Sequence, residues 1–257
     1  MAGYLAALLF ATVNLVSKRR RFDPVATGFL AVGLLAQTTY LILRWVAAGR
    51  APFSNMFESL VLFAWAIVAV YLGLRIRLNI PVLGAATALL AALTLAYAST
   101  YETKIEPLMP ALRSNWLTVH VFTVFLGYGG LALAFLVSLS YLIAARRGSQ
   151  ARPETVLALD DAVTKTISFG FLFLTVGIVS GAVWANSAWG SYWSWDPKET
   201  WSLITWLIYA VFLHGRFMRG WKGKRTAWIS VVGFAAVIFT YFGVNYLLSG
   251  LHSYAKS

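Results

Sequence analysis

Residues 116–145 read WLTVHVFTVFLGYGGLALAFLVSLSYLIAA and contain no Asp, Glu, Lys or Arg. A helix needs roughly 20 predominantly apolar residues to cross the hydrocarbon core of a bilayer, so this run is long enough to span it and to protrude or tilt. Only helices and closed barrels satisfy every backbone polar group in lipid, and the run is far too long for a barrel strand. The stretch therefore predicts a transmembrane helix.

The rest of the chain has the same character. Of its 257 residues, 60% are hydrophobic and 12% are charged, and the mean hydropathy of +0.72 excludes a water-soluble globule. We expect an all-α polytopic membrane protein of about eight transmembrane helices, forming a single integral membrane domain over residues 1–257. Seven further apolar runs are the other candidate spans: residues 3–17, 27–47, 54–74, 80–99, 167–184, 201–217 and 228–248.

The distribution of Lys and Arg predicts the orientation. Most of the 21 basic residues fall in one set of loops, which the positive-inside rule assigns to the cytoplasmic side. Both termini and the loop at residues 185–200 are then external. The net charge of +12 follows from this topology and does not indicate a nucleic-acid-binding surface. The basic cluster at residues 18–21 follows the first apolar run, so we expect an uncleaved span there and not a signal peptide.

The chain contains no cysteine. It therefore cannot form a disulfide, hold an iron–sulfur cluster or bind a cofactor through its own thioether bonds. Any thiol chemistry associated with this protein requires a partner.

The loop at residues 185–200 is unusually aromatic. Its segment WGSYWSWDPKET, residues 189–200, holds three of the 11 tryptophans, whereas an ordinary connection would be short and polar. Flat π surfaces with an acid at the end of the loop suit a large, planar, mostly apolar ligand. We expect ligand contacts from the aromatic residues Trp189, Tyr192, Trp193 and Trp195.

Asp196 begins a helix-capping pattern. Asp196, Pro197 and Glu199 precede the run 201–217 with the spacing of a capping box, which favours a structural role for the two acids. Direct ligand contact by Asp196 is the alternative. The two roles are compatible, because a capped helix would hold the aromatic loop over a ligand, and Lys198 would be placed to meet an acidic group on it.

Two of the three histidines are expected on the same side as this loop. His120 shares a helix face with Trp116 near the external end of its span, and His252 follows the last span. We expect Trp116 to contact the same ligand as His120. Two imidazoles and an aromatic loop would make a pocket for haem, with one histidine on each side of the iron. The alternative is that each is an ordinary interfacial polar residue. Zinc is less favoured, because no third or fourth ligand has a recognisable spacing.

His214 differs from the other two histidines in depth. It lies about 20 Å from the outer start of the run 201–217, toward the inner side, at 1.5 Å per residue. Either it is a satisfied polar residue beside Arg216, or it ligates a second haem whose other ligand comes from another chain. Gly177 and Gly181, four residues apart in the run 167–184, are interpreted as helix-packing residues.

These motifs closely resemble those of the CcsA (ResC) family, the tryptophan-rich (WWD) haem-handling membrane proteins of System II cytochrome c biogenesis. The resemblance covers nearly the whole chain. It rests on the segments 189–200, WLTVH (116–120), LSGLH (248–252) and PFSNMFES (52–59), in which Met56 and Phe57 replace Leu and Tyr of the family pattern. The Asp-Pro-Lys-Glu-Thr ending and the eight expected spans favour this family over the six-span CcmC relatives.

The resemblance implies the haem-handling subunit of a cytochrome c synthase, or haem lyase, acting with a CcsB (ResB) type partner in the bacterial cytoplasmic membrane or the thylakoid membrane. Non-covalent haem b would meet His214 and a ligand from the partner within the membrane. It would then be held externally between His120 and His252, with the tryptophan loop on the porphyrin, for thioether attachment to the Cys-x-x-Cys-His segment of apocytochrome c.

Two other functions fit the same motifs. One is a haem exporter or carrier without a role in attachment, and the other is CcmC-like delivery of haem to a chaperone. The sequence also leaves open whether Glu58 faces the site and which of Arg44, Arg50 and Arg113 would meet the haem propionates.

Overall fold

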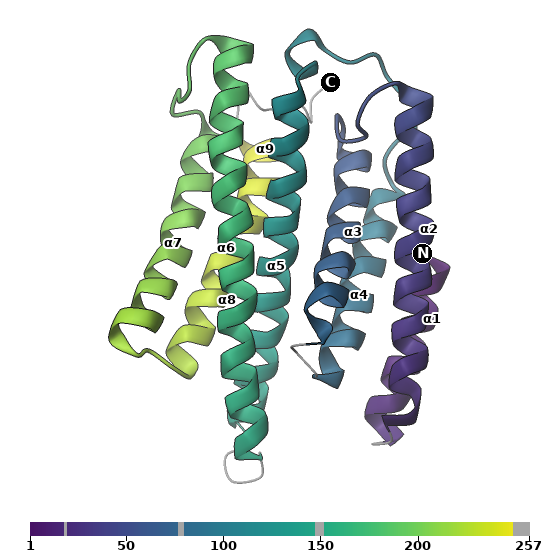
Figure 1. Ribbon diagram of the computed structural model, residues 1–257, viewed down its shortest axis with the longest axis vertical. Helices are drawn as coiled ribbons and strands as arrows, with labels where there is room; N and C mark the ends of the chain where they lie inside the picture. Colours follow the sequence, from purple (N-terminus) through teal and green to yellow (C-terminus); the bar gives the residue numbers. More distant parts are fainter. Residues whose placement is uncertain (18–19, 77–79, 147–151, 249–257) are drawn as a thin grey trace. The chain divides into compact units, whose positions relative to one another are not determined.

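A computed structural model describes residues 1–17, 20–76, 80–146 and 152–248 of the chain (Figure 1). Every regular element in these ranges is a helix, so the predicted all-α class is confirmed. In chain order the elements are α1 (Ala2–Ser17), η1 (Arg20–Phe22), α2 (Asp23–Ala48), α3 (Met56–Arg75), α4 (Pro81–Ala98), η2 (Pro110–Leu112), α5 (Asn115–Arg146), α6 (Pro153–Trp189), α7 (Pro197–Arg219), α8 (Lys224–Ile238), the π-helical turn η4 (Phe239–Gly243) and α9 (Val244–Leu247).

Within the described residues, five helices combine the length and the apolar composition needed to cross a bilayer. They are α2, α3, α5, α6 and the continuous stretch Lys224–Leu247 formed by α8, η4 and α9. Ala2–Ser17 and Val82–Ala98 are shorter apolar helices. The chain is thus a helical integral membrane protein, whereas the number of eight spans and the external termini stay predictions.

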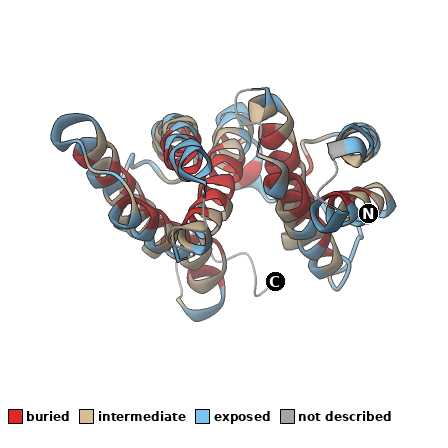
Figure 2. Ribbon diagram, turned by 90° about the horizontal axis from the view of Figure 1, so that it is seen from below, coloured by how far each residue is buried: buried red, intermediate tan, exposed pale blue. Residues whose placement is uncertain are grey.

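The chain divides into two compact units, Met1–Leu108 with α1–α4 and Met109–Ser257 with α5–α9. In the first unit α1 packs against α2 and α4, and α3 packs against α2 and α4. In the second unit α5 packs against α6 and α8, and α7 packs against the same two helices. Figure 2 shows that, within each unit, buried positions gather on the sides where helices face one another.

Buried polar side chains join the helices of the first unit. The Tyr4 hydroxyl on α1 donates a hydrogen bond to the Gln37 amide oxygen on α2 at 2.5 Å. The Gln37 amide nitrogen donates to the Val61 carbonyl on α3 at 2.7 Å. Toward the outside, α2 is apolar, with Leu35 and Val46 68% and 75% exposed. An apolar exterior around bonded interior polar groups is what lipid requires of a helical protein.

In the second unit α5 and α6 pack closely, and glycines make their contact. A Cβ atom at Gly127 of α5 would lie 2.8 Å from the Leu174 backbone nitrogen of α6. A Cβ atom at Gly130 would lie 2.9 Å from the Gly170 Cα. Any side chain at these positions would push the two backbones apart, which is the small-residue packing typical of membrane helices.

α7 is attached to its neighbours near both of its ends. Near its C-terminal end, the Arg216 guanidinium contacts the Asp160 carboxylate of α6 at 2.6 Å, and Asp160 also accepts from the Gly223 backbone N–H at 2.8 Å. Nearer its N-terminal end, the Thr205 hydroxyl lies 3.2 Å from the Thr240 hydroxyl in the π-helical turn. These contacts hold α7, which follows the loop at residues 190–196, against α6 and against the π-helical turn.

Candidate functional site

His120 lies in the second turn of α5 and is half-buried against α6. Its Nδ1 lies 2.7 Å from the Gly177 carbonyl oxygen. Its ring is nearly parallel to the indole of Trp184, with an interplanar angle of 18° and 6.1 Å between ring centroids. His120 is therefore held by contacts to α6, unlike an interfacial histidine that faces only lipid and water.

Trp184 connects His120 to the aromatic loop. Its side chain is 2% exposed, and its Nε1–H donates to the Ala111 carbonyl at 3.0 Å. Its ring meets Trp189 edge to face at 4.8 Å between centroids and 63° between planes. A series of aromatic contacts thus runs from His120 through Trp184 to Trp189, the last residue of α6. The helix ends at the next residue, Gly190, which has a left-handed conformation with φ 74°. In the sequence Trp184 ends the apolar run 167–184, and it is not among the residues expected to contact a ligand.

The aromatic loop presents large rings on its surface. Trp193 and Trp195 pack edge to face, with 5.8 Å between centroids and 88° between planes. Tyr192 and Trp195 are 60% and 69% exposed. Trp195 also adopts φ 59°, a left-handed conformation that is strained for a bulky residue. This loop therefore offers flat apolar surface that the fold itself does not bury.

The predicted capping box at the start of α7 is present. The Asp196 carboxylate accepts from the Lys198 backbone N–H at 3.0 Å, and the Glu199 carboxylate accepts from the Asp196 backbone N–H at 3.2 Å. Glu199 also accepts from the Ser194 backbone N–H at 2.8 Å, so the same acid holds the loop. Asp196 is only 6% exposed, consistent with its capping role.

Lys198 extends toward α9. Its Nζ donates to the Asn245 side-chain oxygen at 2.9 Å, and the Asn245 amide nitrogen donates to the Tyr241 carbonyl in the π-helical turn at 2.7 Å. Burial lowers the pKa of Lys198 to about 8, against the opposing attraction of Asp196. The lysine thus links the cap of the aromatic loop to the end of the last helix.

The other expected site residues lie apart from this aromatic series or outside the described residues. Trp116 is 48% exposed, one helical turn before His120. His214 is exposed on α7, while its neighbours Phe212 and Gly215 are buried. An exposed imidazole on the surface of α7 is open to a ligand or to another chain. His252 lies outside the described residues.

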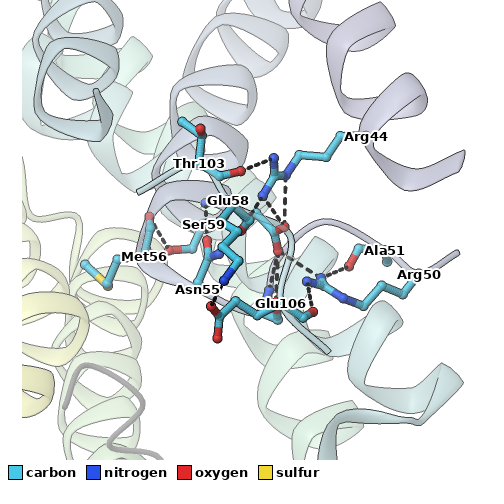
Figure 3. A network of polar contacts seen from close by, with 11 residues as sticks. Arg44, Arg50, Ala51, Asn55, Met56, Glu58, Ser59, Thr103 and Glu106 are labelled. Atoms are coloured by element: carbon cyan, nitrogen blue, oxygen red, sulfur yellow. Dashed lines mark hydrogen bonds and ion pairs between the residues drawn. The ribbon is translucent and has the colours of Figure 1, made fainter. Parts of the chain in front are cut away.

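Glu58 lies at the centre of a network of polar contacts with Arg44 and Arg50, which Figure 3 shows. It is 0% exposed, and its two carboxylate oxygens accept from Arg44 Nε at 2.9 Å and from Arg50 Nη1 at 3.0 Å. The same arginines donate to the backbone carbonyls of Thr103 at 2.8 Å and Glu106 at 3.2 Å. Glu58 therefore clamps α2, α3 and the segment after α4 together within the first unit.

Among the residues that the structure describes, no three His, Asp or Glu side chains gather closely enough to hold a metal ion by themselves. The residues present, an oriented imidazole and exposed indole rings, match the needs of a metalloporphyrin.

The family described as cytochrome C assembly protein matches residues 53–252. Among curated proteins, the cytochrome c biogenesis protein CcsA of a Synechococcus species is 42% identical over 287 residues, covering 98% of this chain and 94% of the relative. The CcsA of Prochlorococcus marinus is 41% identical over 266 residues, covering 90% and 84%. That of Gloeobacter violaceus is 38% identical over 314 residues, covering 97% and 93%.

A solved structure, the cytochrome c haem lyase CcmF, has a similar fold. It superposes with a TM-score of 0.68 at 22% identity over 94% of this chain. The chain spans 44% of the length of that structure, so the likeness concerns the fold of one part of it.

Proposed function

Because this chain belongs to the cytochrome c assembly protein family, we propose that it is the haem-handling subunit of a cytochrome c synthase. Its role lies in cytochrome c maturation. In this proposal it carries haem b across the membrane and presents it on the external face for attachment to apocytochrome c. It acts there together with a CcsB (ResB) type membrane partner.

The observation that carries the proposal is the orientation of His120. Histidines that ligate a metal commonly donate their second ring N–H to a backbone carbonyl, which sets the tautomer. The distance of 2.7 Å from Nδ1 to the Gly177 carbonyl oxygen matches that arrangement and leaves the lone pair on Nε2, the nitrogen that would bind iron. The aromatic series then leads from this imidazole to the exposed loop.

His120 and His252 are proposed as the two axial ligands of the external haem. Trp116, Trp189, Tyr192, Trp193 and Trp195 are proposed to contact the porphyrin, and Asp196 to hold their loop in place. Ligation by two imidazoles keeps the iron low-spin. His214 is proposed to ligate haem within the membrane, with the opposing ligand from the partner. Its exposure on α7 supports this, because the partner's ligand can approach.

The attachment step is an addition that needs no oxidant. Each thiol of the substrate Cys-x-x-Cys-His segment adds across one vinyl group, so that sulfur bonds to one vinyl carbon and the other gains a hydrogen. The substrate histidine replaces one axial ligand. In this step the chain would hold the haem plane in one orientation and exclude others. In favourable intramolecular reactions, positioning of this kind lowers the activation barrier by about 7–11 kcal/mol.

The test combines spectra with product analysis. His120→Ala should change the spectrum of haem that copurifies with the chain, and added imidazole should restore it. Co-expression of the unaltered chain with its CcsB-type partner and an apocytochrome should yield covalent haem. Haem bound without any thioether product would instead favour a carrier, and an unchanged His120→Ala spectrum would remove His120 from the site.

A further inference from the structure

We propose that Gly181 and Trp184 of α6 are positioning residues for His120, and that together with the Gly177 carbonyl they fix its ring plane and its tautomer. The three α6 positions lie on one helix face, because they are four and three residues apart. This inference rests on the proposed role of His120 as a haem ligand.

Gly181 leaves the space that the imidazole occupies. A Cβ atom at this position would lie 2.5 Å from His120 Nδ1 and 2.6 Å from Cε1. Real Cβ atoms do not approach other atoms so closely, and the His120 ring is a rigid plane that cannot bend away from the contact. Even an alanine here would therefore rotate the ring or separate the helices.

Gly177, one turn earlier, has a different part. A Cβ atom there would lie 2.5 Å from the Val124 Cγ2 and 3.1 Å from the Val124 backbone nitrogen. The absence of a side chain lets α5 approach until the Gly177 carbonyl reaches Nδ1 of His120. The two glycines therefore have different roles. Gly177 allows α5 and α6 to pack closely, and Gly181 sets the orientation of the His120 ring.

Trp184 supports the ring one turn beyond Gly181. Its indole is nearly parallel to the imidazole and is itself held by the bond from Nε1–H to the Ala111 carbonyl. Because Trp184 is almost fully buried, it cannot turn aside to make room for another rotamer of His120. The ring is confined between a position without a side chain and a fixed indole.

The cradle formed by Gly177, Gly181 and Trp184 has a chemical consequence. A hydrogen bond from Nδ1–H to a carbonyl raises the basicity of the other ring nitrogen, and loss of such outer partners typically weakens metal binding about 10–100-fold. A more basic ligand favours ferric over ferrous iron, so disturbing the cradle should raise the reduction potential of the bound haem.

The experiment compares two alanine substitutions in the full chain, purified with its haem. A Cβ atom at Gly181 would contact the His120 ring. A Cβ atom at Gly170, in the same helix pair, would instead lie 2.8 Å from the Leu131 Cδ2 and 3.0 Å from the Gly127 carbonyl oxygen, so Gly170→Ala disturbs helix packing without contacting His120. We expect Gly181→Ala to weaken haem binding about 10–100-fold and to raise the midpoint potential, with recovery in added imidazole. Gly170→Ala should keep the parent spectrum and potential.

A second variant keeps the test decisive where Gly181→Ala fails to accumulate. Trp184→Phe retains an aromatic ring but loses the bond to Ala111, and it should also raise the midpoint potential. If Gly181→Ala and Gly170→Ala changed the haem spectrum equally and imidazole restored neither, both effects would come from disturbed helix packing. That result would overturn the inference. So would a parent-like potential in Trp184→Phe. An unchanged His120→Ala spectrum would instead defeat the proposed function itself.

Discussion

At the scale of single residues, Glu58 is a fully buried charge with several hydrogen-bond partners. Two guanidinium groups, from Arg44 and Arg50, and the Ser54 backbone N–H at 2.8 Å share its carboxylate. The charge is satisfied by this cluster and not by water, because Glu58 is fully buried. Burying charges is costly unless each is paired and hydrogen-bonded, so removing one member leaves the others uncompensated.

We therefore expect Glu58→Gln to destabilise the protein by about 3–5 kcal/mol, because two arginines lose their shared counter-charge in a buried site. The measurement is thermal or denaturant unfolding in detergent micelles. Glu106→Gln is the matched control: its carboxylate is 65% exposed and lies 3.8 Å from Lys104, so its loss should cost less than about 1 kcal/mol. Equal losses of unfolding free energy in the two variants would contradict this stabilising role of Glu58.

At the scale of elements, the loop between α6 and α7 is held by its ends. Gly190 ends α6, the capping box starts α7, and Lys198 ties that cap to Asn245. The π-helical turn before Asn245 widens the helix locally, a feature that often occurs at functional sites. The loop that carries the exposed indoles has no regular structure, but the helix ends on both sides of it are fixed by these contacts.

Asp196 is the part of this frame that can be tested by substitution. Asp196→Ala should cost about 0.5–2 kcal/mol, because the first turn of α7 loses its side-chain acceptor. Asp196→Asn should retain most of that stability, since asparagine caps equally well. Hydrogen exchange at the backbone amide of Lys198 reports the effect directly. Equal protection in Asp196→Ala and the parent would exclude a capping role.

At the scale of the whole molecule, both units are built entirely of helices in the part that the structure describes, and five helices are long and apolar enough to cross a bilayer. The fold likeness to the haem lyase CcmF covers nearly all of this chain. The family assignment places the chain in cytochrome c maturation, and its apolar helices agree with a membrane protein. The orientation of the chain in the membrane is a prediction from the distribution of Lys and Arg.

The absence of cysteine makes the orientation easy to test. Ser191→Cys, in the aromatic loop, should react with a membrane-impermeant maleimide added to intact cells. Arg219→Cys, at the end of α7, should react only after permeabilisation, because the positive-inside rule places it in the cytoplasm. The cysteine-free parent controls for background labelling. The reverse pattern would invert the topology and move the aromatic loop to the cytoplasmic side.

The sequence by itself determined the helical membrane class and the cap at Asp196. Both depend on residues close together in the chain: apolar runs of bilayer length, and a carboxylate within reach of the next backbone N–H groups. His120 and the aromatic loop were also selected by residue type and by a family resemblance.

Only the tertiary structure decided which side chains meet. It placed His120 on the Gly177 carbonyl, 57 residues away, gave Gly181 and Trp184 a place around its ring, and enclosed Glu58 between two arginines. The physical reason is that a uniformly apolar helix has no polar face to indicate which side meets a neighbour. The contact is chosen by the shapes of the opposing surfaces, and these exist only once the helices have packed.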